Sequence, residues 1–125
     1  MELNIEQHDN SEKSLLRLDL QGRLNTGTAP MLDTTLQQAI DGERQMVLLN
    51  MAQLEYISSA GLRVIFKAAK QMKAAGRSLA VSNRQPQVEK VFEILQALPD
   101  MAVFASDAEL DDYLDAMQKK VTGDD

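Results

Sequence analysis

The feature that most constrains the fold is a run at Met46–Met51 that is apolar apart from Asn50, followed a few residues later by a helical pattern. A run with little alternation is typical of a strand that is buried on both faces of a sheet. Beyond it, apolar side chains recur at helical spacing, namely Leu62, Ile65, Phe66, Ala69 and Met72. A buried strand that leads through a short loop into an amphipathic helix predicts an α/β fold with parallel strands.

The N-terminal part of the chain predicts a hairpin and a helix ahead of this unit. Residues 3–7 and 16–20 alternate between apolar and polar side chains, with a turn expected at Asp9–Ser11. A loop with two glycines is expected at 21–27. Thr28 can then cap a helix whose first turn tolerates a proline.

The C-terminal part continues the alternation of strands and helices. Strands are expected at Leu79–Val81 and Met101–Phe104, with a helix that opens at Gln85–Pro86 between them. Ser106–Glu109 has the pattern of a capping box and predicts a last helix. The predicted order is β-β-α-β-α-β-α-β-α, in one α/β domain whose mixed, mainly parallel sheet is covered by helices.

Composition narrows the class of protein. The predicted domain covers residues 1–121, with a flexible tail at 122–125. The chain has 125 residues, no cysteine and a net charge of −6, so neither a disulfide nor a thiolate metal site can form. Signal-peptide and membrane-helix patterns are missing, so we expect a cytoplasmic protein that does not enter the membrane. The lack of a broad basic patch argues against direct DNA binding and favours a protein partner.

Motifs for catalysis and for cofactors are also missing. A serine hydrolase needs a base beside its nucleophile, and the only histidine is His8. The glycines at 22–27 have the spacing of a phosphate loop, but no lysine follows them. Asp107, Asp111 and Asp115 line one helical face without a binding loop, so they predict a solvated acidic surface. We therefore expect a protein that is not an enzyme and holds no cofactor or metal.

Two adjacent serines, Ser58 and Ser59, occupy the junction between the central strand and its helix. The start of a helix presents unpaired N–H groups and the positive end of the dipole, which favour an anion. A serine hydroxyl there can cap the helix, act as a nucleophile or accept a phosphate. Farther along the helix, Arg63, Lys67 and Lys70 form a basic stripe, which is either its solvated side or a contact surface.

Residues 56–64 resemble the phosphorylation loop of the STAS-domain anti-sigma factor antagonists, the bacterial proteins also called anti-anti-sigma factors. Residues 22–28 are similar to the Gly-x-Leu-Asp-x-x-Thr segment of that family, and 58–62 to its Asp-Ser-Ser/Thr/Ala-Gly-Leu segment. Residues 88–92 resemble part of a later helix. The resemblance extends over nearly the whole chain, with both segments in the expected order of strands and helices.

Two positions depart from the family pattern, because Asn25 and Ser58 stand where aspartates are usual. The spacing to Gly61 and Leu62 places Ser59 in the register of the family's phosphoserine, with Ser58 as the alternative acceptor. The resemblance also implies a set of partner-binding residues. These are Asn25, Thr26, Ser58, Ser59, Gly61, Leu62 and Arg63.

The resemblance implies a partner switch. The unmodified protein would bind an anti-sigma factor that is also a histidine-kinase-like serine kinase, and so release a sigma factor. Phosphorylation of Ser59 would end the binding, and a PPM-type phosphatase would reverse it. A STAS module that regulates another partner, in stress or biofilm signalling, shares every one of these residues. A small ligand-binding domain or enzyme that uses the Asn25 and Ser59 loops as a pocket is the more remote alternative.

Overall fold

The computed structural model describes residues 3–94, 102–104, 106, 108–109 and 111–112. The elements in chain order are β1 (Leu3–Asn10), β2 (Leu15–Leu24), α1 (Ala29–Asp41), β3 (Met46–Ile57), α2 (Ser59–Ala74), β4 (Ser78–Ser82), α3 (Pro86–Ile94) and β5 (Ala102–Phe104). Within these residues the strands form one five-stranded sheet in the order β1-β2-β3-β4-β5. The β1–β2 pair is antiparallel and the other pairs are parallel, which confirms the predicted mixed sheet.

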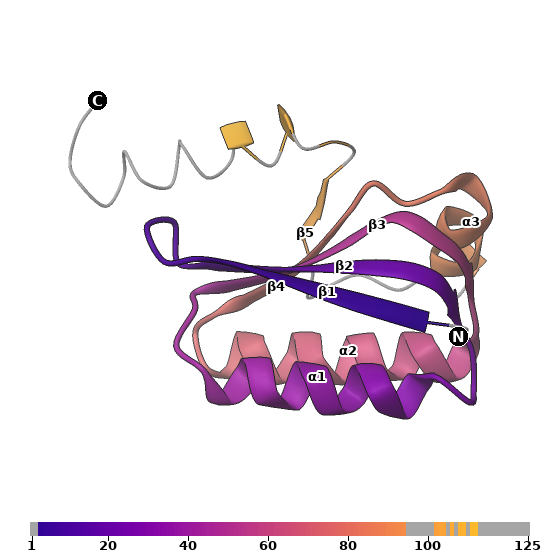
Figure 1. Ribbon diagram of the computed structural model, residues 1–125, viewed down its shortest axis with the longest axis horizontal. Helices are drawn as coiled ribbons and strands as arrows, with labels where there is room; N and C mark the ends of the chain where they lie inside the picture. The colour runs from indigo at the N-terminus through magenta and orange to yellow at the C-terminus, as the bar shows by residue number, and fades with distance from the viewer. Residues whose placement is uncertain (1–2, 95–101, 105, 107, 110, 113–125) are drawn as a thin grey trace.

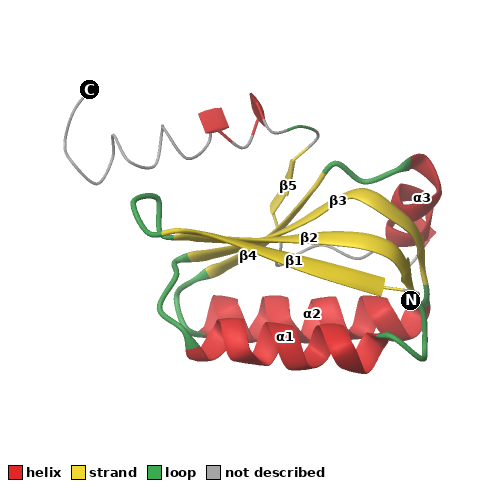
Figure 2. Ribbon diagram, viewed as in Figure 1, coloured by secondary structure: helices red, strands yellow, loops and turns green. Residues whose placement is uncertain are grey.

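The two longest helices, α1 and α2, lie side by side against one face of the sheet (Figures 1 and 2). The core between the sheet and these helices contains fully buried side chains such as Leu18, Leu49 and Leu62. From α3, Phe92 joins the same core and meets Phe66 of α2 edge to face, with the ring centroids 6.3 Å apart. The apolar pattern of the sequence therefore corresponds to one main core and a second, smaller cluster formed by Leu15, Met46, Leu48 and Ala80.

The hairpin turn lies at residues 11–14 and not at Asp9–Ser11, so that prediction is wrong. Strand β1 continues through Asn10, and its last five residues are exposed. The Asn10 side chain accepts a hydrogen bond of 3.2 Å from the Lys13 N–H, and Ser14 adopts a φ of 51°. The polar residues Asp9 and Asn10, which suggested a turn, lie in β1, a solvent-exposed edge strand. An edge strand tolerates such polar side chains.

Strands β2 and β3 are longer than predicted, and together they remove two expected loops. The segment 21–27 was expected to be a loop, but β2 runs to Leu24. Its pairing with β3 shifts register on either side of Gly22, whose φ of 103° is easy only for glycine. In the same way β3 continues from Met51 to Ile57 and leads directly to Ser58. Pairing between the two strands thus overrides the local loop signals.

The predicted last helix falls mostly outside the described residues, as does the predicted tail at 122–125. Its first turn is partly described. The N–H of Glu109 donates a hydrogen bond of 3.3 Å to the Ser106 hydroxyl, as a capping serine requires.

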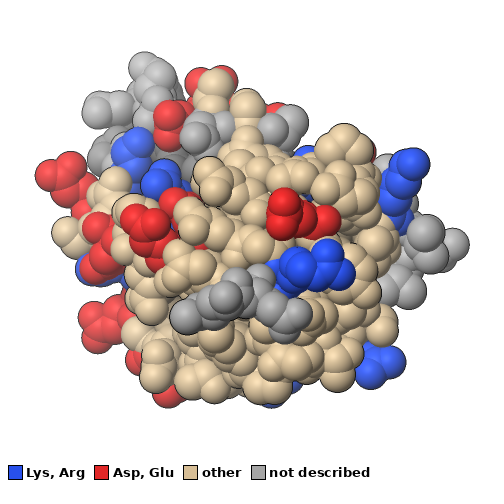
Figure 3. All heavy atoms as spheres, turned by 45° about the vertical axis from the view of Figure 1, so that its right-hand side comes forward, with Lys and Arg blue, Asp and Glu red and all other residues tan. Residues whose placement is uncertain are grey.

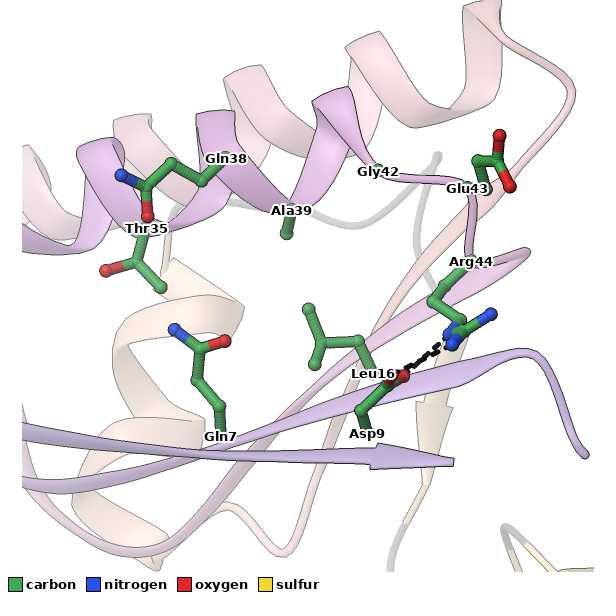
Figure 4. Close-up of a pocket in the computed structure, with 9 residues that line it drawn as sticks. All are labelled: Gln7, Asp9, Leu16, Thr35, Gln38, Ala39, Gly42, Glu43 and Arg44. Carbon is green, nitrogen blue, oxygen red and sulfur yellow. Dashed lines mark hydrogen bonds and ion pairs between the residues drawn. The ribbon is translucent and has the colours of Figure 1, made fainter. Parts of the chain in front are cut away.

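One ion pair joins the hairpin to the segment between α1 and β3. Arg44 donates from Nε and Nη2 to the two carboxylate oxygens of Asp9, at 2.6 and 2.8 Å. The pair lies beside a shallow pocket between β1 and α1 (Figure 4). The hydrogen bond from Arg44, together with its charge, lowers the pKa of the Asp9 carboxyl below its usual value.

We expect Asp9→Asn to lower the melting temperature at neutral pH. A lowered pKa in the folded state means that the pair stabilises fully above the pKa of the unfolded carboxyl. This stabilisation is lost as the pH falls through the lowered pKa, so wild type and variant should converge in acid. Thermal melts between about pH 7 and pH 2 measure the difference. Glu12→Gln is the control, because it removes a carboxylate of the same hairpin that forms no ion pair among the described residues. A deficit of Asp9→Asn that persists in acid would contradict this explanation.

Candidate functional site

Ser58 is the N-cap of α2. Its backbone is extended, with φ −96° and ψ 169°, and its hydroxyl oxygen accepts a hydrogen bond of 3.2 Å from the Gly61 N–H. Its carbonyl accepts the first helical hydrogen bond, 3.0 Å from the Leu62 N–H. The side chain is half-buried. The Ser58 hydroxyl is therefore committed to the start of the helix.

Ser59 is the first residue of α2, and its side chain is exposed. Among the described residues, no group forms a hydrogen bond with its hydroxyl. A kinase can reach this oxygen without breaking any contact of the fold. The geometry thus favours Ser59 over Ser58 as a phosphate acceptor, and the assignment stays a prediction.

The two predicted loops meet at one end of the sheet. Leu24 of β2 and Ile57 of β3 are partners in the parallel register, and the Ser58 N–H donates to the Leu24 carbonyl at 2.9 Å. The carboxyl ends of parallel strands share one edge, so Asn25 and Ser58 both leave the sheet there. Gly61 packs against the same point, because a Cβ on it would lie 2.6 Å from Leu24 Cγ.

Asn25, and not Thr28, supplies the side-chain cap at the start of α1, so the predicted role of Thr28 is wrong. The Asn25 side-chain oxygen accepts from the Thr28 N–H at 3.0 Å, and its carbonyl accepts from the Ala29 N–H at 2.8 Å. The Thr28 hydroxyl points back, accepting from the Asn25 N–H and donating to the Arg23 carbonyl, both at 2.9 Å. Thr28 has helical backbone angles, φ −100° and ψ −13°, which turn its oxygen away from the helix. An amide oxygen accepts as a carboxylate does, so asparagine keeps this turn without the charge.

The predicted partner-binding residues divide by exposure. Thr26, Ser59 and Arg63 are exposed, while Asn25 and Ser58 are half-buried. The other two, Gly61 and Leu62, are buried and position the helix against the sheet.

Two large apolar side chains are exposed that the sequence did not single out, Tyr56 at 40% and Met31 at 42%. Tyr56 lies just before the serines, and the Arg23 guanidinium stands over its ring at 4.4 Å from the centroid. Arg23 and Tyr56 are partners in the β2–β3 register. The exposure of Tyr56 could have been predicted only if β3 had been extended past Met51. In that longer strand Leu54 and Ile57 are buried, and Tyr56 between them is exposed.

Hydrolase chemistry does not fit this site. His8 pairs with Arg17, near the hairpin end of β2, whereas the serines follow Leu24 at the other end. Leu24 lies seven positions along β2 from Arg17, a distance of about 23 Å at 3.3 Å per residue. No cluster of potential metal ligands occurs among the residues described. Within the same residues, no helix has the length and apolar character needed to span a bilayer.

A single sheet with two helices packed against one face, and an exposed serine at the start of one of them, defines a small α/β domain. The chain belongs to the STAS domain family, whose sequence model matches residues 2–110. Anti-sigma factor antagonists of this family are not enzymes, which confirms the expectation of a non-enzymatic protein.

Similar proteins include BtrV of Bordetella bronchiseptica, a candidate anti-sigma factor antagonist. It is 40% identical over 75 residues, which cover 60% of this chain and 65% of BtrV, just under two thirds of its length. The unphosphorylated form of SpoIIAA, an anti-sigma factor antagonist, superimposes with a TM-score of 0.68 at 19% identity, covering 97% of this chain and 96% of SpoIIAA. An anti-sigma factor antagonist from Mycobacterium paratuberculosis gives 0.78 at 16% identity, with 93% and 94% covered. At such identities the two structures establish the fold alone.

Proposed function

We propose that the chain is an anti-sigma factor antagonist controlled by phosphorylation of Ser59. In its unmodified form it binds an anti-sigma factor in the cytoplasm, and the sigma factor held by that protein is released. The anti-sigma factor is a histidine-kinase-like serine kinase that phosphorylates Ser59 and so ends the binding. A PPM-type phosphatase removes the phosphate and restores the active form.

The observation that carries the proposal is the contrast between the two serine hydroxyls. Ser58 Oγ is held by the Gly61 N–H, whereas the exposed Ser59 Oγ has no partner among the described residues. Both lie at the end of the sheet where Arg23, Tyr56 and the Asn25 turn also meet. An exposed hydroxyl among aromatic and cationic side chains suits a surface that both docks a protein and is modified.

Comparison with SpoIIAA supports a switch without refolding. That Bacillus protein is known in a phosphorylated form as well, and this chain superimposes on it with a TM-score of 0.68. The unphosphorylated form gives 0.68 as well, so each form has the fold of this chain. A phosphate carries a charge of about −1.5 to −2 at neutral pH, and the start of α2 tolerates that charge. A partner that must bury the same group cannot accommodate it without cost.

We expect Ser59→Ala to keep the fold and to bind the anti-sigma factor permanently. The variant loses the hydroxyl that the kinase modifies, while Ser58 continues to cap α2. The partner is first isolated by co-purification with the unmodified chain from its native host. Incubation of the purified kinase with ATP should then label the wild type and leave Ser59→Ala unlabelled.

The matched control is Ser58→Ala, which should keep phosphorylation but lose stability. It should still be labelled, and it should lose about 1 kcal/mol of folding free energy because the helix cap is removed. Labelling of Ser59→Ala at the wild-type rate would move the acceptor away from Ser59. A co-purified partner that is neither a kinase nor bound to a sigma factor would instead favour a STAS module of another pathway.

A further inference from the structure

We propose that the basic stripe of α2, formed by Arg63, Lys67 and Lys70, docks against an acidic face of the anti-sigma factor. The inference rests on the proposed function and adds the chemistry of the partner surface. Arg63 is already among the predicted partner-binding residues, and the inference extends that surface to Lys67 and Lys70.

The charge of α2 is opposite to that of the chain. The protein carries a net charge of −6, yet α2 contains four basic residues and no acidic one. Arg63, Lys67 and Lys70 recur at intervals of four and three residues, so they lie along one side of the helix, and all three are exposed. In the view of Figure 3, most of the visible acidic side chains gather toward the left, while basic side chains lie both among them and farther to the right.

Contacts within the domain leave most of this charge available. Lys67 lies 3.4 Å from Asp33 of α1, but both groups are substantially exposed and such pairs are weak. Arg63 and Lys70 form no ion pair among the described residues. Gln37 of the neighbouring helix α1 donates an uncharged hydrogen bond of 2.8 Å to Gln71 of α2. The stripe therefore presents cations to whatever approaches α2.

The stripe is continuous with the proposed site. Arg63 follows Ser59 by one helical turn, so the cations extend directly from the modified residue along the exposed side of α2. From Arg63 to Lys70 the helix rises about 10 Å, a length that matches a local patch on a folded protein. A long polyanion such as nucleic acid, or a membrane, would also meet the repulsion of the net negative charge. These observations select an acidic protein surface as the occupant.

The test is the association rate with the anti-sigma factor kinase isolated by co-purification. Lys67→Gln/Lys70→Gln removes two positive charges and is expected to slow association about three- to tenfold at low salt. The difference should shrink at about 0.5 M salt, where the screening length is only a few ångströms. Lys13→Glu is the control, because it also lowers the net charge by two. Lys13 lies in the hairpin turn before β2, at the end of that strand opposite to the serines.

The outcomes separate this inference from the proposed function. If the wild type binds and is phosphorylated while both variants associate alike, only the docking inference fails. If no kinase binds the wild type, the proposed function fails and the inference fails with it. Binding of the wild type to anionic vesicles or to duplex DNA, lost in Lys67→Gln/Lys70→Gln while kinase association is unchanged, would also overturn it. Circular dichroism spectra and melting curves confirm that both variants are folded.

Discussion

Ser59→Asp is expected to weaken binding to the anti-sigma factor by at least about tenfold while the isolated domain stays folded. At the start of α2, which has no acidic residue in its first turn, a carboxylate stabilises by about 0.3–1 kcal/mol. Arg63, four residues later, adds a favourable interaction on the same side of the helix. In the complex the same carboxylate must lose water, and an unpaired buried charge costs several kcal/mol. Since about 1.4 kcal/mol is tenfold in affinity, stability and binding should change in opposite directions.

The control for this experiment is Ser59→Asn, which has nearly the same size as aspartate and no charge. It separates the cost of bulk from the cost of charge. Calorimetry of the complex and thermal melting of the free protein are measured for both variants. If Ser59→Asp binds like the wild type although the domain is folded, Ser59 lies outside the docking surface, and the switch mechanism is wrong. If both variants bind equally weakly, the surface is sensitive to size and the electrostatic explanation fails.

The architecture could be predicted because the pattern of its central unit is decided locally. Five of the six residues of Met46–Met51 are apolar, and those five are buried in β3. Likewise the helical spacing of α2 predicts the side that faces the sheet, and Leu62 and Ile65 on it are fully buried. Two such segments in succession leave few alternatives to a parallel strand–helix–strand unit.

The edges of the elements could not be predicted, because they depend on contacts between distant segments. In the sequence alone, Gly22 indicates a loop. In the structure it lies within β2, paired with β3, and its positive φ allows the shift in register there. The cap of α1 has the same difficulty. Thr28 fits the sequence pattern for a cap, but its hydroxyl is held by the Arg23 carbonyl, so Asn25 takes that role. At the site, the position of the serines at the start of α2 could be predicted from the sequence. The exposure of Tyr56 could not, because it depends on the continuation of β3 to Ile57.

Gly61→Ala is expected to destabilise the domain by about 1–3 kcal/mol, although glycine to alanine usually favours a helix. The added Cβ would lie 2.6 Å from Leu24 Cγ and 2.8 Å from Leu24 Cδ2, closer than atoms can approach. Leu24 is fully buried and cannot turn into solvent. The methyl group would therefore push the start of α2 away from β2. Urea denaturation measures the loss, with Gly27→Ala as the control, whose Cβ would make only an ordinary contact of 3.4 Å.

The double variant Leu24→Ala/Gly61→Ala tests whether this one contact holds the two loops together. Leu24→Ala alone should cost about 2–5 kcal/mol, because it opens a cavity in the core. In the double variant the new methyl group enters that cavity, so the combined loss should be smaller than the sum of the single losses by about 0.5–3 kcal/mol. Simple additivity would show that the two positions act independently. In that case the alignment of the Asn25 turn with Ser59 would depend on the hydrogen bond from the Ser58 N–H to the Leu24 carbonyl, and not on side-chain packing.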